Sequence, residues 1–200
     1  MTLEKVIEEV TLVANCEPSL QSHGRWLLDR LSETRSWVVE GQPLQVGWSL
    51  FTPVRVGARI WVHEPDFECD PERNTRNEIS VSVGILAQQI EVVRRAGVTP
   101  RDVYFADVME VQQGALEATD AVLERFETAN RGHSGWIAKP RGDDSGELRR
   151  IPVFELLRRR REWLQVLCLP PGYMAVFRRS DIEAILDRDD NDVWHQGIET

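Results

Sequence analysis

The residues best suited to chemistry form a short stretch in which acids alternate with other residues. Every second position carries a carboxylate: Glu64, Asp66, Glu68, Asp70 and Glu72. In an extended backbone alternate side chains point the same way, so these groups would line one edge and could capture a basic surface of a partner. Pro65 and Pro71 favour the alternative of a solvated loop with incidental spacing. Calcium binding is a third interpretation, although the order lacks the glycine of an EF-hand loop.

A second group of acids lies near the C-terminus and ends in a tryptophan. An aromatic ring beside carboxylates suits the anchoring of a basic partner. The alternative is a Trp194 ring that folds back over the sheet. From the two groups we predict these partner-binding residues: Glu64, Asp66, Glu68, Asp70, Asp189, Asp190, Asp192 and Trp194.

Few residues could form a catalytic or metal site. His63 stands beside Glu64 and Asp66, which admits the alternative of a metal-dependent hydrolase, and Cys69 with His63 could be considered a nucleophile and its base. No third orienting group accompanies that pair, and the sequence contains no HExxH, GxGxxG, Walker or GxSxG motif. The three cysteines are widely spaced and form no CxxC pair. We therefore expect no catalytic residues, no metal site and no cofactor.

The charge is unevenly distributed along the 200 residues, whose net charge is −9. Residues 1–130 carry 21 acids and 12 bases, whereas residues 131–200 carry 12 of each. Such a surface repels nucleic acid and anionic lipid and favours basic partners. The run Arg158 to Arg161 could contact phosphate, but successive helical positions point in different directions, and acids of its own domain are available as partners. We expect a partner that is neither nucleic acid nor membrane.

The length and hydropathy pattern predict a soluble protein with one large or two small domains. No apolar run approaches the roughly 18 residues that a membrane span needs, and the acidic, polar N-terminus is unlike a secretion signal. In the first part, helical spacing of Trp26, Leu27, Leu28 and Leu31 predicts a helix over 19–34. Alternating residues predict strands over 44–51 and 59–63 as a hairpin, and 3–4 spacing predicts a helix over 80–96.

In the remainder of the chain, strands are expected over 102–111, 136–138, 173–177 and 182–186, and a helix over 152–164. The apolar spacing of residues 116–126 fits both a helix and a strand imperfectly, so either is possible there. The sum is an α+β fold with small antiparallel sheets and packed helices. Turn-forming glycines after Asn130 suggest two domains, an N-terminal α+β region over 1–129 and a second domain over 130–200.

Three segments of the last third resemble a known family. They are Ser134-Gly135-Trp136, preceded by His133 where the family usually has Asp; Ile151-Pro-Val-Phe-Glu-Leu-Leu157; and Leu169-Pro-Pro-Gly-Tyr-Met-Ala-Val-Phe177. In this order and spacing they resemble immunity protein family 33 of the polymorphic toxin systems, over about residues 130–195. The N-terminal part, with Val62-His-Glu-Pro-Asp-Phe67 before a helix, looks like the extension of longer members.

The resemblance implies a cytoplasmic bacterial protein that binds and neutralises a cognate toxin by occluding its active site. It implies no catalytic residues. The recurring motif residues look structural, since Gly135 and Gly172 permit turns while Trp136 and Phe177 supply apolar area. Two alternatives remain open beside it: the metal-dependent hydrolase built on His63 and its adjacent acids, and an adaptor protein of a secretion system.

Overall fold

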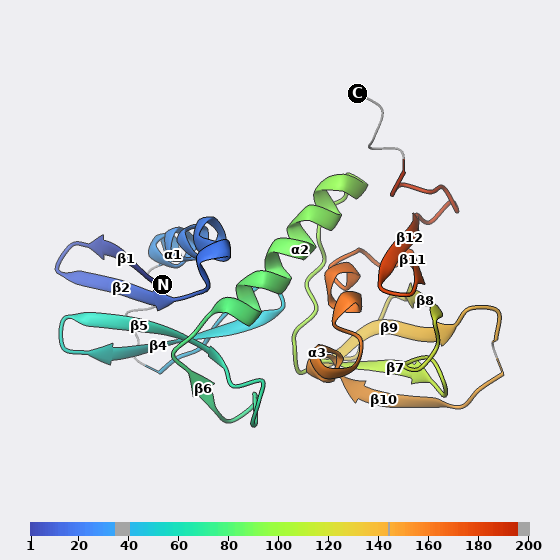
Figure 1. Cartoon of the computed structure of the whole chain (residues 1–200), viewed down its shortest axis with the longest axis horizontal. Coiled ribbons are helices and arrows are strands. Elements are labelled where there is room, and N and C mark those ends of the chain that lie inside the picture. The colour runs from blue at the N-terminus through green and yellow to red at the C-terminus, as the bar shows by residue number, and fades with distance from the viewer. Residues whose placement is uncertain (35–40, 144, 196–200) are drawn as a thin grey trace. The chain divides into compact units, whose positions relative to one another are not determined.

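The computed structural model describes residues 1–34, 41–143 and 145–195 (Figure 1). By its contacts the chain forms two compact units, Met1–Ala87 and a second that begins at Gln88. The boundary falls within helix α2 (Ser80–Ala96). Each unit has its own sheet, and each is described by itself below.

The first unit is built on a sheet of six strands among its described residues. In sequence order these are β1 (Thr2–Ile7), β2 (Val10–Asn15), β3 (Leu44–Val46), β4 (Ser49–Val56), β5 (Arg59–Pro65) and β6 (Thr75–Arg76). The spatial order is β1-β2-β5-β4-β3, and β6 pairs with β5. The β2–β5 pair is parallel and the other pairs are antiparallel.

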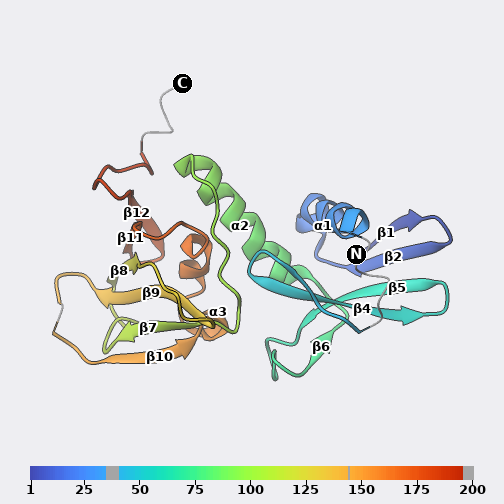
Figure 2. The same ribbon diagram turned by 180° about the vertical axis from the view of Figure 1, so that it is seen from behind.

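Helix α1 (Gln21–Thr34) supplies the apolar layer of the first unit, after the short helix η1 (Pro18–Leu20). Leu27, Leu28 and Leu31 are buried and belong to one cluster with Phe51 and Ile60 of the sheet. Figures 1 and 2 both draw α1 alongside β1 and β2. The expected helix is confirmed, although Trp26, counted in its apolar stripe, is 38% exposed.

Two expectations about the strands of this unit need correction. The strand expected over 44–51 is divided, because Gly47 at φ +59° turns the chain between β3 and β4. Glycine adopts this conformation readily, and a Cβ here would lie 2.5 Å from Leu86 Cδ1, so a larger residue would also displace the Leu86 side chain. Strands β1 and β2 were not expected, since β1 places only Leu3 fully in the core and its alternation is weak.

The second unit has another six-stranded sheet among its described residues. Its strands are β7 (Val108–Gln112), β8 (Asp120–Arg125), β9 (His133–Pro140), β10 (Leu148–Pro152), β11 (Met174–Arg178) and β12 (Asp181–Leu186). The spatial order is β10-β7-β9-β8-β11-β12, with β7–β9 parallel and the other pairs antiparallel. The ambiguous segment 116–126 thus contains a strand. The strand expected from residue 102 begins only at Val108, after a turn in which Asp107 N donates to Tyr104 O.

The expected helix over 152–164 is replaced by three short pieces. These are η3 (Val153–Glu155), α3 (Leu156–Arg159) and η4 (Arg161–Val166). Arg160 separates the last two at φ −149°, and its buried guanidinium donates to the carbonyls of Ala118 and Arg179 and to Glu162. Within the arginine run, therefore, Arg160 points inward while Arg158, Arg159 and Arg161 are exposed.

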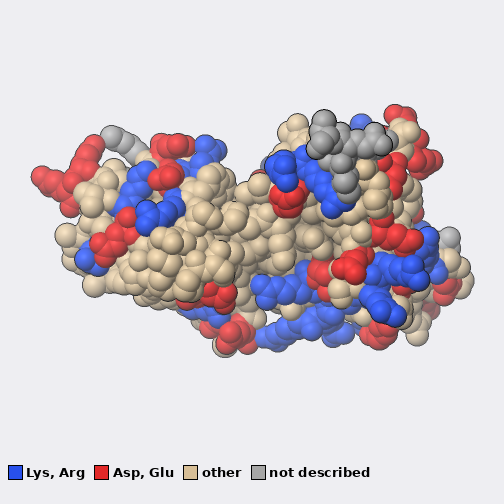
Figure 3. Space-filling model, turned by 45° about the horizontal axis from the view of Figure 1, so that its top comes forward, with Lys and Arg blue, Asp and Glu red and all other residues tan. Residues whose placement is uncertain are grey.

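The α+β class is confirmed, and each sheet adds one parallel pair to its antiparallel ones. The domain boundary expected at 129/130 falls between β8 and β9, which pair with each other, whereas the contacts divide the chain between Ala87 and Gln88. Among the described residues no helix combines the length and apolarity needed to cross a bilayer. Acidic and basic side chains interleave on the face seen in Figure 3.

Candidate partner-binding site

The acidic stretch of the first unit begins with a carboxylate that lies inside the protein. Glu64, at the end of β5, has no exposed surface. Its Oε1 accepts from Arg76 Nε at 3.0 Å, and its Oε2 accepts from the backbone N–H of Ser82 at 2.7 Å. Ser82 lies in the first turn of α2, where a negative charge is favoured by the unpaired N–H groups and the helix dipole. Glu64 therefore joins β5, β6 and α2, and it is not presented to a partner.

Burial raises the pKa of Glu64 above the ordinary value of a glutamate, while the hydrogen bonds from Ser82 and Arg76 act in the opposite direction. A buried carboxylate persists in proteins where such partners compensate for lost hydration. Because Glu64 is buried and its carboxylate is hydrogen-bonded on both oxygens, we interpret it as a residue that supports the fold.

The rest of the stretch turns instead of extending. Cys69 N donates to Asp66 O, and Asn74 N donates to Asp70 O. The carboxylates of Asp66 and Asp70 accept from backbone N–H groups two residues further on, which is the geometry of Asx turns. Glu68 is 83% exposed and pairs with Arg76 at 2.9 Å. The interpretation in which these acids share one extended edge is therefore wrong, and the segment forms a loop, as Pro65 and Pro71 had favoured.

The residues considered for catalysis or metal binding lie on β5 and on the loop after it. His63 is half-buried on β5, and loss of hydration lowers the pKa of its imidazole. Cys69 is exposed in the loop. Within 1–34, 41–143 and 145–195, no group of three or more His, Cys, Asp or Glu side chains is arranged to hold a metal ion.

In the second unit the predicted C-terminal residues form a folded segment. The Trp194 ring lies under the guanidinium of Arg95, 3.6 Å from its carbon to the ring centroid, and Arg95 Nε donates to Trp194 O at 2.9 Å. Asp192 accepts from Trp194 N and pairs with His195. Trp194 thus folds back onto the protein, but it packs on the last turn of α2 and not over the sheet as the alternative had it.

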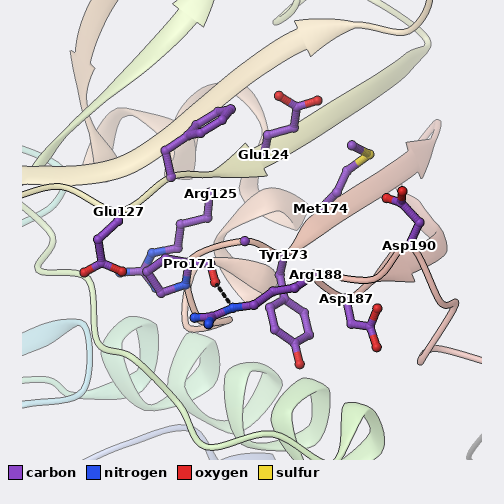
Figure 4. Close-up of a pocket in the computed structure, with 11 residues that line it drawn as sticks. Glu124, Arg125, Glu127, Pro171, Tyr173, Met174, Asp187, Arg188 and Asp190 are labelled. Atoms are coloured by element: carbon purple, nitrogen blue, oxygen red, sulfur yellow. Dashed lines mark hydrogen bonds between the residues drawn. The ribbon is translucent and has the colours of Figure 1, made fainter.

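A hollow on the second unit lies beside this segment and has a volume of about 520 Å³ (Figure 4). Three stretches of chain far apart in sequence form it: the end of β8 with the residues after it, the turn before β11, and the loop after β12. Its lining residues are Glu124, Arg125, Phe126, Glu127, Pro171, Gly172, Tyr173, Met174, Asp187, Arg188 and Asp190. We call this hollow the β8–β11 groove.

Arg125 fixes the turn that forms one wall of the groove. Its backbone carbonyl accepts from Gly172 N at 2.7 Å, and its N–H donates to Tyr173 O at 2.9 Å. Its guanidinium is buried and donates to the carbonyls of Arg101, Leu167 and Leu169. Burial, with a further contribution from the Arg101 charge, lowers the pKa of Arg125 to about 10.

Glycine is required at the tip of the same turn. Gly172 has φ +88°, and a Cβ there would lie 2.6 Å from Arg188 Cγ. Arg188 runs across this open space and donates through Nε to Pro171 O at 2.9 Å (Figure 4). The Leu169–Phe177 motif thus provides the backbone of the groove wall, as its proline and glycine content indicates.

Most of the charged residues that line the groove are acidic. Glu124 and Glu127 have basic neighbours only at 3.7 Å, Lys139 and Arg101 respectively. Asp187 accepts from the N–H groups of Asn191 and Asp189, and these bonds lower its pKa. Its carboxylate is therefore ionised at neutral pH.

Of the residues predicted from the sequence, Asp190 lines the groove and Asp189 lines an adjoining hollow with Tyr173, Asp187 and Arg188. Glu124 at the end of β8 and the following residues Phe126 and Glu127 were not predicted. A firm assignment of strand over 116–126 would have placed them at a strand end, where functional residues often gather.

The second unit is therefore an α+β domain whose main surface feature is an open groove with a charged rim. The model of the Imm33-like domain family matches residues 88–196, which begins where this unit begins. The chain belongs to the Imm33-like domain family, a family of immunity proteins. Comparison with curated proteins and with solved structures finds no match.

Proposed function

We propose that this protein binds a cognate bacterial toxin in the cytoplasm and neutralises it by covering its active site. The observation that carries the proposal is the family match, which spans the whole of the second sheet. An inhibitor of this kind works by shape and charge complementarity and needs no catalytic group. In this proposal the protein is not an enzyme.

Acids with exposed or partly exposed side chains in both units are the natural contacts for a basic toxin surface. Asp66, Glu68 and Asp70 lie on the loop after β5, and Asp189 and Asp190 lie on the loop after β12. Carboxylates on a rim steer a basic partner toward the site and take the place of an anionic substrate. Glu64 is left out of this set because its carboxylate is buried, and Asp192 and Trp194 are assigned to support the segment.

The test is protection from a candidate toxin, and a toxin domain encoded next to the gene of this protein would be the first candidate. The toxin domain is expressed in bacteria with and without this chain, and survival is counted. We expect co-expression to restore growth, and the purified proteins to form a stable complex by size-exclusion chromatography and calorimetry. Growth arrest despite full expression, together with no complex at micromolar concentrations, would contradict the proposal.

The same preparation distinguishes the two alternatives. A hydrolase would turn over a substrate without a toxin present and would lose that activity in His63→Ala. A secretion-system adaptor would bind components of the export apparatus and give no protection. Either result would replace immunity as the function of this chain.

A further inference from the structure

The β8–β11 groove is lined by apolar and acidic residues, and these limit the kinds of molecule that can bind in it. Phe126 is 50% exposed although it is a large aromatic residue. Pro171, Tyr173 and Met174 continue the apolar lining toward β11. An exposed aromatic residue in a concave site is the type of group that contributes most to protein–protein binding.

Both arginines that line the groove bond to the protein's own main chain. The Nη1 group of Arg125 donates to the carbonyls of Arg101, Leu167 and Leu169. Arg188 donates through Nε to Pro171 O. Four carboxylates also line the groove: Glu124, Glu127, Asp187 and Asp190. Arg101 lies 3.7 Å from Glu127 and Lys139 lies 3.7 Å from Glu124, so it is mainly Asp187 and Asp190 that favour a cationic group on the occupant.

The groove is also longer than one side chain. The adjoining hollow shares Tyr173, Asp187 and Arg188 with it and extends to Gly97 at the end of α2. Together the two hollows fit a stretch of polypeptide better than a compact small molecule. The aliphatic stem of a lysine or arginine packs well on an aromatic face while its charged end reaches carboxylates.

We propose that the β8–β11 groove is where the toxin docks, through a loop that inserts a lysine or arginine side chain beside Phe126. The cationic end lies among Glu124, Asp187 and Asp190, and flanking apolar residues of the loop cover Tyr173 and Met174. This proposal rests on the proposed immunity function and adds to it the surface and the chemistry of the partner.

The first test removes two charges without changing the shape of the groove. Glu124→Gln with Asp190→Asn keeps side-chain size, and asparagine tolerates the φ of +60° found at position 190. The matched control is Glu110→Gln with Asp181→Asn, which makes the same charge change on strands β7 and β12 of the same unit. Glu110, like Glu124, has a basic neighbour, Arg150 at 3.5 Å.

The second test removes the exposed apolar group. Phe126→Ala is compared with Leu148→Ala, because both side chains belong to residues that are 50% exposed and only Phe126 lines the groove. Affinity for the purified toxin is measured by calorimetry, with folding of each full-length variant checked by circular dichroism. We expect the dissociation constant to rise about tenfold or more for the double charge variant and for Phe126→Ala. Both control variants should stay within about twofold of the original protein, as contacts outside a hot spot do.

Other outcomes separate this proposal from the function on which it rests. If the original protein binds the toxin and both groove variants bind it equally well, the groove is not the docking site and the immunity function stands. Tighter binding by the charge variant would show an anionic loop instead and overturn the proposal. A dimer of this chain that is seen by sedimentation and that dissociates in the Phe126→Ala variant would also overturn the proposal. If the original protein does not bind the toxin, the proposed function itself fails.

Discussion

The acidic loop after β5 and the acidic loop after β12 are alike in composition but differ in what their carboxylates contact. In the first, Glu64 is fully buried against Arg76 and the N-terminal turn of α2. In the second, Asp187 and Asp190 line an open groove. A dense run of acids therefore has no fixed role. Its position relative to helix ends and basic side chains decides whether it supports the fold or faces a partner.

The largest expected effect concerns Arg125, which positions the groove wall. Arg125→Met removes a buried cation and the donor to the carbonyls of Leu169 and Arg101, whereas Leu167 O keeps its bond from Trp136 Nε1. An unpaired buried carbonyl costs roughly 1–3 kcal/mol, so we expect the free energy of unfolding to fall by about 3 kcal/mol. This change in unfolding free energy is measured by urea denaturation monitored by circular dichroism.

Arg101→Met serves as the control for this variant. Its side chain is 62% exposed and meets Glu127 only at 3.7 Å, so the change should be below about 0.5 kcal/mol. An Arg125→Met protein as stable as the original would mean that the groove wall does not depend on this arginine.

The next effect tests the buried carboxylate of the first loop. Glu64→Ala leaves Ser82 N and part of the Arg76 guanidinium without an acceptor. We expect a loss of about 2 kcal/mol, because Arg76 keeps its exposed partner Glu68. Glu68→Ala, at a side chain that is 83% exposed, should cost less than about 0.5 kcal/mol. Equal losses of unfolding free energy in the two variants would show that the buried Glu64 contributes no more to stability than the exposed Glu68.

A smaller effect is expected at the C-terminal tryptophan. Trp194→Ala removes the contact with the Arg95 guanidinium, and contacts of this kind contribute roughly 1 kcal/mol. A double-mutant cycle with Arg95→Ala isolates the pair from other changes. If Trp194→Ala instead leaves stability unchanged and weakens toxin binding tenfold, Trp194 is an anchor for the partner and not a support for α2.

The smallest effect is expected on association of the toxin with the loop after β5. Reversing Asp66 and Glu68 to lysine should slow association two- to threefold at low salt, with little change at high salt, because exposed charges act over a screened distance. Glu9→Lys with Glu17→Lys makes the same charge change at exposed positions of the same unit. Stopped-flow measurements at two ionic strengths compare them. Unchanged kinetics would remove this loop from the binding surface.

Local pattern sufficed for the elements whose apolar periodicity is strong. Helix α2 and strands β5, β11 and β12 lie close to their expected positions. Strand β10 was missed because Ile151 is its one fully buried residue, so neighbouring arginines dominate its composition. The helix expected after it is broken by Arg160, whose burial depends on carbonyls supplied by the loop 115–118 and by Arg179.

The candidate site was predicted only in part, for a related reason. Asp189 and Asp190 were identified by composition, and the Leu169–Phe177 motif indicated a turn. Nothing local to Glu124 or Phe126 indicates that they face that turn, because the contact depends on the pairing of β8 with β11. Glu64 was misplaced because alternation along a chain does not reveal which side chains a later helix will cover.

The amino-acid sequence by itself determined the fold class, the absence of recognisable catalytic motifs, and the family to which the chain belongs. Each of these depends on the types of residue and on their order over short stretches of the chain. The tertiary structure decided which acids are buried and which line a groove. That choice depends on strand pairing and on the bonds of Arg125 and Arg76 to groups distant in sequence. Burial and charge compensation are properties of neighbours in space, and the order of residues along the chain does not specify them directly.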